Sequence, residues 1–169
     1  TTGVSRDGTA LFPLMPYPEY KYMATEDVHA IVAYLRTLEP VENPDIPERK
    51  LNFPLNLIVN TIPSEAAPQP MPDPADTVAY GEYLTLIGGC AGCHTPMEKG
   101  TAIEEMYLAG GQSFRFPSGG VVRALNITPD ETSGIGNWTK EAFITRFKMY
   151  EDPAMHSVPV SEGGMNTPM

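Results

Sequence analysis

A five-residue motif, Cys90-Ala91-Gly92-Cys93-His94, constrains this chain more than any other feature. Two cysteines separated by two residues and followed directly by histidine form the attachment pattern of a c-type haem. Each thiol can add to a vinyl group of the porphyrin, and the adjacent imidazole is then carried under the iron as its proximal ligand. The motif therefore predicts a fold built around a covalently bound macrocycle.

The content of helix-breaking residues limits the fold further. The chain has 169 residues, of which 18 are Pro and 15 are Gly, and this predicts long irregular loops between few helices. A small protein with so much loop needs an additional source of core, and a haem is a large apolar body around which short helices can pack. We therefore expect an all-α, cytochrome c-like domain with a few short helices and long irregular loops.

Charge and cysteine content exclude several classes of function. The net charge of −10 makes nucleic-acid binding implausible, because an acidic surface repels phosphate backbones. Both cysteines lie in the motif, so neither a disulfide framework nor a four-cysteine zinc site can form. No apolar run reaches the roughly 18–20 residues of a membrane span. The chain begins at Thr1 without a signal peptide, which suggests a processed product or a fragment.

Two other kinds of site also use a Cys-x-x-Cys pair, namely a redox-active dithiol and a zinc site. A redox-active dithiol of the thioredoxin kind lies beside a βαβ unit, and the sequence shows no such alternation. A zinc site would need further ligands, whereas His29 and His156 are both distant in the sequence. Haem attachment is therefore the preferred interpretation of the motif.

Three helices are expected. The first covers residues 25–38, with Thr25 as N-cap and one buried face at helical spacing formed by Val28, Ile31, Val32, Leu35 and Leu38. The second begins between Pro74 and Thr77 and ends near Ile87; Gly81 inside it costs about 1 kcal/mol relative to Ala, which predicts a close helix crossing there. Thr139 caps the third, whose inner face carries Phe143, Ile144 and Phe147.

Proline positions define the remaining segments. Pro13, Pro16 and Pro18 exclude a helix in residues 1–24, which should form a loop. Residues 40–76 contain nine prolines and should form a semi-rigid, extended connector. Val121 and Val122 are expected to form a short extended piece.

The sixth iron ligand decides what a haem can do. An iron whose sixth position is filled by the protein shuttles electrons, whereas an open position can bind peroxide or another small ligand. Met169 is the preferred candidate, because it follows Pro168 on a loop well after His94; thioether ligation raises the redox potential. His156 is the rival and would give bis-histidine ligation. Met15, between Pro13 and Pro16, is either a core filler or a metal ligand.

Residues 79–169 resemble a haem domain of the bacterial dihaem and multihaem cytochromes c, including the cytochrome subunits of membrane-bound alcohol and aldehyde dehydrogenases. The matching stretches are Gly81-Glu82-Tyr83-Leu84, the haem motif, Leu108-Ala109-Gly110-Gly111, Asn126-Ile127-Thr128-Pro129-Asp130 and Gly134-Ile135-Gly136-Asn137-Trp138-Thr139.

The resemblance extends to the start of the chain. In this family the axial methionine lies in a Met-Pro-Trp or Met-Pro-Tyr loop that precedes a final helix, and Met15-Pro16-Tyr17 with the helix from Thr25 to Leu38 looks like such an ending. The resemblance thus implies three parts. Residues 1–39 are the C-terminal part of a first cytochrome c domain, 40–76 are the connector, and 77–169 are a second haem domain that lacks its final helix.

The departures from the family pattern matter as well. The first domain has no haem motif of its own, and the second stops at Met169, so both chain ends look like cuts in a longer protein. Met15 would then be the ligand of a second haem, attached outside this sequence, while one haem c is attached here. An alternative is that residues 1–39 dock onto residues 77–169 in permuted order, within one chain or between two; we prefer the neighbouring-domain interpretation.

The resemblance implies an electron-transfer protein rather than an enzyme. It would carry single electrons between a dehydrogenase or quinol-oxidising complex and a terminal acceptor such as an oxidase. It would work in the periplasm or at the outer face of a membrane, in association with a membrane complex. Alternatives are a peroxidase-like haem enzyme, the haem subunit of a dehydrogenase, and a structural module without haem. Arg123, Asn126 and Trp138 could lie near the haem edge or propionates, or serve only as loop residues.

Overall fold

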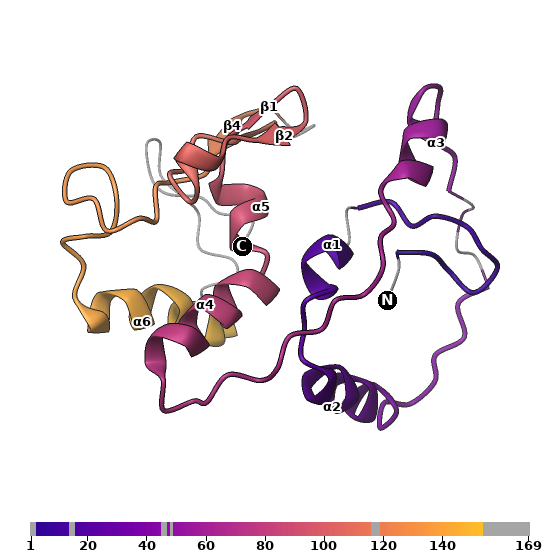
Figure 1. Ribbon diagram of the computed structural model, residues 1–169, viewed down its shortest axis with the longest axis horizontal. Helices are drawn as coiled ribbons and strands as arrows, with labels where there is room; N and C mark the ends of the chain where they lie inside the picture. The colour runs from indigo at the N-terminus through magenta and orange to yellow at the C-terminus, as the bar shows by residue number, and fades with distance from the viewer. Residues whose placement is uncertain (1–2, 14–15, 45–46, 48, 116–118, 154–169) are drawn as a thin grey trace. The chain divides into compact units, whose positions relative to one another are not determined.

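The computed structural model describes residues 3–13, 16–44, 47, 49–115 and 119–153. The chain divides into two compact units, Thr1–Gly89 and Cys90–Met169. Figure 1 draws the helices and strands of the chain. The helices of the first unit are α1 (Tyr17–Tyr20), α2 (Thr25–Leu35), α3 (Leu55–Ile58), the 3₁₀ turn Val59–Thr61 and α4 (Thr77–Ile87). The helices of the second are α5 (Cys90–His94), α6 (Lys140–Lys148) and the 3₁₀ turns Glu104–Met106 and Met149–Glu151.

The prediction of an all-α fold is correct only in part, because the second unit also contains two antiparallel hairpins. β1 (Met97–Glu98) pairs with β2 (Thr101–Ala102), and β3 (Ser113–Arg115) pairs with β4 (Val121–Arg123). The first hairpin turns at Lys99 and Gly100, whose φ angles of 52° and 85° are those of a tight two-residue hairpin turn. The extended piece expected at Val121 and Val122 is β4.

The second and third predicted helices are confirmed. α4 begins at Thr77, where the carboxylate of Asp76 accepts a hydrogen bond of 3.1 Å from the Ala79 amide. α6 follows Thr139, whose hydroxyl accepts one of 3.1 Å from the Ala142 amide, as the cap prediction requires.

The first predicted helix is also present, but its start differs from the prediction. In α2 the N-cap is Ala24, and Thr25 is already helical, so no side chain caps this end. The loop expected over residues 1–24 contains the single turn α1, with Pro18 in its first turn. Proline is tolerated there, because the amide that it lacks has no partner within the helix in any case.

The core of the first unit is small. Its buried apolar residues are Ala10, Tyr17, Met23, Ala24, Val59 and Tyr83. The Tyr17 hydroxyl donates a hydrogen bond of 3.0 Å to the Leu11 carbonyl, which closes the N-terminal loop over its ring. The connector then lies along the turn after α1: the amide of Ala67 donates to the Lys21 carbonyl, and the amide of Gln69 to the Tyr22 carbonyl. This part of the connector therefore docks through its backbone. The prediction of an extended connector over residues 40–76 is wrong for its middle, which contains α3 and the 3₁₀ turn Val59–Thr61.

The predicted buried faces of two helices are exposed in the described structure. In α2, Ile31 and Leu35 are 46% and 55% exposed, and in α6, Phe143 and Phe147 are 44% and 56% exposed. Helical periodicity shows that a face can be buried, but a partner surface is needed to bury it. The close crossing expected at Gly81 is also wrong, since a Cβ there would meet nothing within 4 Å.

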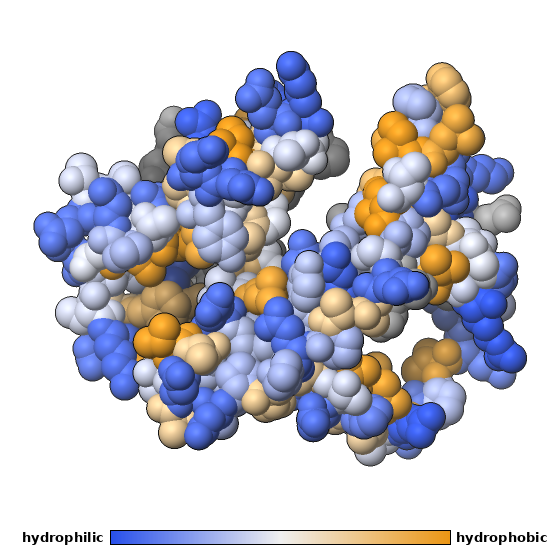
Figure 2. Space-filling view, viewed as in Figure 1, coloured by the Kyte–Doolittle hydropathy of each residue, from blue (hydrophilic) through white to orange (hydrophobic). Residues whose placement is uncertain are grey.

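Apolar side chains also gather on the segment that carries α3 (Figure 2). They belong to Phe53, Leu55, Leu57 and Ile58, all of which are exposed. Within the same segment Val59 is only 4% exposed, so one side chain anchors the turn to the first unit.

The described helices are all too short or too polar to cross a membrane.

The division of the chain into parts at residues 39 and 76 stays a prediction. The structure adds one relevant contact, because α4 packs with α1 and with the start of α2 in the first unit. The helices before the connector, α1 and α2, are thus in contact with α4, the helix that follows it.

Replacing Thr139 by Ala should destabilise the second unit by about 1 kcal/mol, because the amide of Ala142 loses its acceptor. The control Thr145→Ala removes an exposed threonine from the middle of α6 and should cause no loss, since Ala has the higher helix propensity. Urea unfolding followed by circular dichroism compares the two. Equal stability of both variants would contradict the capping role.

Candidate functional site

The predicted motif forms a helix of its own. α4 ends at Ile87, and Gly89, with a φ of +65°, redirects the chain into α5. A residue other than glycine rarely adopts this backbone conformation. α5 consists of the motif residues alone and brings together Cys90, which is partly buried, Cys93, which is exposed, and the imidazole of His94. Both thiols are free and stand on a single turn of helix.

A backbone carbonyl orients the histidine. Nδ1 of His94 lies 2.7 Å from the carbonyl oxygen of Leu125, which is 31 residues further along the chain. A carbonyl can only accept, so Nδ1 carries the proton and donates. The other ring nitrogen, Nε2, is then unprotonated and can bind a metal. The ring is thus held in one tautomer and one orientation by a group outside α5.

Gly110 makes this approach possible. Its amide donates a hydrogen bond of 2.6 Å to the His94 carbonyl, and its φ is +76°. A Cβ at this position would lie 2.5 Å from the carbonyl carbon of Leu125 and 2.6 Å from its oxygen. Only glycine therefore lets the backbone of Leu125 come close enough to accept the hydrogen bond from Nδ1 of His94.

Thr95 ties the same loop to the end of α5. Its side chain is only 3% exposed, and its hydroxyl accepts a hydrogen bond of 3.1 Å from the amide of Leu108. Leu108 has a φ of +60°, and its carbonyl accepts from the amide of Ile127. The loop thus links α5 on one side to the segment around Leu125 on the other.

The segment after Leu125 is densely hydrogen-bonded. The carboxylate of Asp130 accepts from the amides of Thr132 and Ser133 and from the Ser133 hydroxyl, and these bonds lower its pKa below the ordinary value. Gly134 and Gly136 lie against the backbone of residues 128–130, closer than any Cβ would allow.

The three residues suggested for the haem edge have different environments. Asn126 uses its side chain within the loop, accepting from Thr128 and donating to Ser133. Arg123 donates to the Ser113 hydroxyl across the second hairpin, and Trp138 is 41% exposed. Asn126 therefore has a structural role in the loop, and a role of any of the three near a haem stays a prediction.

The surroundings of the first thiol change its acidity. Burial raises the pKa of the Cys90 thiol above its ordinary value, and the neighbouring Cys93 acts in the same direction. The nucleophilic cysteine of a dithiol oxidoreductase instead has a lowered pKa, which keeps it as thiolate. The described part of the chain also holds no group of three or more His, Cys, Asp or Glu side chains that could bind a metal ion.

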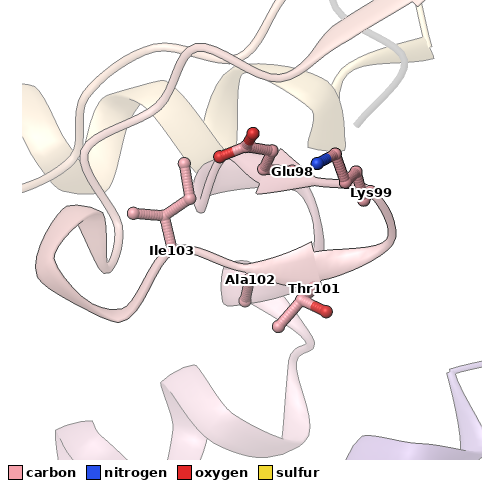
Figure 3. A pocket seen from close by; sticks show the side chains of 5 residues that line it. All are labelled: Glu98, Lys99, Thr101, Ala102 and Ile103. Atoms are coloured by element: carbon pink, nitrogen blue, oxygen red, sulfur yellow. The ribbon is translucent and has the colours of Figure 1, made fainter.

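A separate hollow lies on the first hairpin (Figure 3). It has a volume of about 390 Å³ and is lined by Glu98, Lys99, Thr101, Ala102 and Ile103. It contains neither cysteine nor histidine, so it is distinct from the predicted site.

The predicted distal ligands cannot be compared with the structure. Met15, Met169 and His156 lie outside the described residues. His29, the remaining histidine, is exposed on α2. The distal ligand therefore stays a prediction.

Reasoning from sequence missed the roles of three residues: Gly110, Leu125 and Thr95. The glycine pair at residues 110–111 was a visible signal of a special backbone conformation. The carbonyl of Leu125 carries no signal, because any residue type can supply it, and its position depends only on the path of the chain.

Comparisons with known proteins identify the relatives of the chain. It is 34% identical to the cytochrome c subunit of the quinone alcohol dehydrogenase of Gluconacetobacter polyoxogenes, over 86% of the chain and 33% of that subunit. It is 30% identical to the gluconate 2-dehydrogenase cytochrome c subunit of Pantoea cypripedii, over 82% and 34%. It is 33% identical to the fructose dehydrogenase cytochrome subunit of Gluconobacter japonicus, over 82% and 29%.

No protein-family model matches the chain. The chain spans about one third of the length of these relatives. The resemblance to these subunits covers most of the chain, and it agrees with the geometry of α5 and His94. Most of the chain is therefore homologous to one part of the cytochrome c subunits of these dehydrogenases.

Proposed function

We propose that this protein is a c-type cytochrome that carries single electrons from a dehydrogenase or quinol-oxidising complex towards a terminal acceptor, without a catalytic role of its own. The observation that carries the proposal is the setting of His94. Its Nδ1 is held by the Leu125 carbonyl, and the two free thiols of Cys90 and Cys93 stand on the same helical turn.

The donor set fits a haem c. Cys90 and Cys93 would hold the porphyrin through thioether bonds, and Nε2 of His94 would bind the iron. When bound, the haem supplies a one-electron couple at its iron. The contribution of the chain is to orient the imidazole through the hydrogen bond from Nδ1 to Leu125, which also raises the basicity of Nε2.

The apolar surface of the second unit supports the same proposal. No large apolar side chain of this unit is buried among its described residues. Nine are more than one third exposed: Met97, Met106, Tyr107, Val121, Leu125, Trp138, Phe143, Ile144 and Phe147. A folded unit of this size needs apolar burial, and a macrocycle would supply the surface for it.

The distal ligand that we propose is Met169, with His156 as the rival. Met15 would bind a second haem attached in a longer form of the protein, as the greater length of the relatives allows. The acidic surface, with a net charge of −10, would favour redox partners with basic docking surfaces. Covalent haem attachment would place the protein in the periplasm or on the outer face of a membrane.

Replacing both Cys90 and Cys93 by Ser should abolish covalent haem, because no thiol remains to bond the vinyl groups. Expression with a haem-attachment system, followed by haem staining of a denaturing gel and by intact mass, measures the loss. The control His29→Ala removes an exposed histidine outside the motif and should keep full haem content. A wild-type protein without covalent haem would overturn the proposed function.

Replacing Met169 by Ala should remove the ferric absorption band of a methionine–iron bond and lower the redox potential. The same change at Met15 should leave the band of the haem bound at Cys90 and Cys93 intact. Absence of this band from the wild-type protein, with a low-spin spectrum that is lost only in His156→Ala, would assign the ligand to the histidine. Rapid reaction of the wild-type protein with peroxide would instead indicate an open iron and a peroxidase-like enzyme.

Replacing Gly110 by Ala should push the Leu125 carbonyl away from Nδ1 of His94 and weaken its hold on the ring. Destabilisation by more than about 1 kcal/mol is expected, together with a shifted redox potential. Gly100→Ala is the matched control, since Gly100 has a φ of +85° but open space around it. Gly100→Ala should be destabilised by the same strained backbone conformation, but its redox potential should stay that of the wild type. Equal potentials in both variants would contradict the role of Gly110.

A further inference from the structure

Tyr83 of α4 joins two segments that are far apart in the sequence. Its side chain is only 3% exposed. The hydroxyl donates a hydrogen bond of 2.5 Å to the carboxylate of Asp27, 56 residues away, and accepts one of 3.0 Å from the amide of Ala24. Both partners belong to the start of α2.

These bonds satisfy groups that would otherwise be buried without partners. Ala24 is fully buried, so its amide needs an acceptor from the protein, and the Tyr83 hydroxyl supplies one. The hydroxyl in turn stays a donor, because burial and the Asp27 carboxylate both raise the pKa of Tyr83. Losing either partner leaves a buried polar group unpaired, which costs more than an ordinary hydrogen bond contributes.

Apolar packing between the same elements is incomplete. A groove of about 540 Å³ remains between them, lined by Tyr20, Met23, Val28 and Ile31 on one side and by Leu84, Ile87 and Gly88 on the other. An open apolar groove constrains the sliding of two helices only weakly. The directional bonds of Tyr83 therefore hold the register of α4 on α2.

We propose that Tyr83 is a positioning residue, which locks the helix that leads into the haem motif onto the segment that precedes the connector. Without the bonds of Tyr83, the 41 residues between α2 and α4 would act as a linker that lets the two helices move relative to each other. The link to electron transfer rests on the proposed function: α4, which the lock holds within the first unit, ends three residues before Cys90 of the proposed haem motif.

Spin labels on the two helices test the lock without using the haem. Tyr34→Cys in α2 and Val78→Cys in α4 offer exposed sites, with 66% and 80% of the native side chains accessible. Pulsed electron resonance on the haem-loaded protein then gives the distribution of distances between the labels. We expect a narrow distribution in the labelled parent, and one at least twice as wide after Tyr83→Phe or Asp27→Ala.

Two further variants separate positioning from simple loss of structure. Tyr80→Phe removes a hydroxyl from the same helix, one for which the described structure shows no hydrogen bond, and should keep the distribution narrow. Asp27→Asn keeps an acceptor for the Tyr83 hydroxyl, so the distribution of distances should be as narrow as in the labelled parent. In hydrogen exchange, the amide of Ala24 should exchange on the order of tenfold faster in Tyr83→Phe. Unchanged distance distributions and exchange in Tyr83→Phe would overturn the proposal.

The number of spin labels on each molecule tests haem attachment separately from the lock. If haem occupies Cys90 and Cys93, the intact mass shows two labels on each molecule. Four labels would contradict haem attachment. The lock is then measured in the same variants with Cys90→Ser and Cys93→Ser, where a narrow distribution that broadens in Tyr83→Phe still supports it.

Discussion

The hydrogen bond from His94 Nδ1 to the Leu125 carbonyl is the contact on which the second unit depends. It selects the tautomer of the imidazole and leaves Nε2 available for iron. Gly110 allows the contact, because any side chain there would collide with Leu125. Thr95 and Leu108 then tie the loop to α5. A short helix, a glycine and a backbone carbonyl together hold this side chain in one tautomer and one orientation, as the proposed iron ligand requires.

The segments around this contact are densely hydrogen-bonded, but their apolar side chains are not well packed. The carboxylate of Asp130 and the glycines at 134 and 136 fix the path of the chain after Leu125, while large apolar side chains such as Phe143 and Phe147 remain exposed. Polar loop chemistry thus shapes this unit more than a hydrophobic core does. This combination of hydrogen-bonded loops and exposed apolar side chains fits the proposed haem. The loops would set the orientation of the ligand, and the haem would supply the apolar surface that the unit lacks.

The first unit relies on different forces. Its few buried residues, among them Tyr17, Ala24 and Tyr83, are each joined to a neighbour by a directional hydrogen bond. The proline-rich connector adds backbone bonds at Ala67 and Gln69. Because proline restricts the unfolded chain, such a segment loses less entropy on docking than a flexible linker would. A protein with little core can therefore still hold defined positions.

The sequence by itself determined the proposed haem motif and the three longest of the described helices, α2, α4 and α6. The Cys-x-x-Cys-His spacing is local, and so are the caps of α4 and α6, which is why these features could be predicted from neighbouring residues. Only the tertiary structure decided which carbonyl orients His94, how Tyr83 joins α2, and which faces stay exposed. These depend on contacts between residues 31 to 59 positions apart, and no local pattern encodes where a distant backbone group will lie.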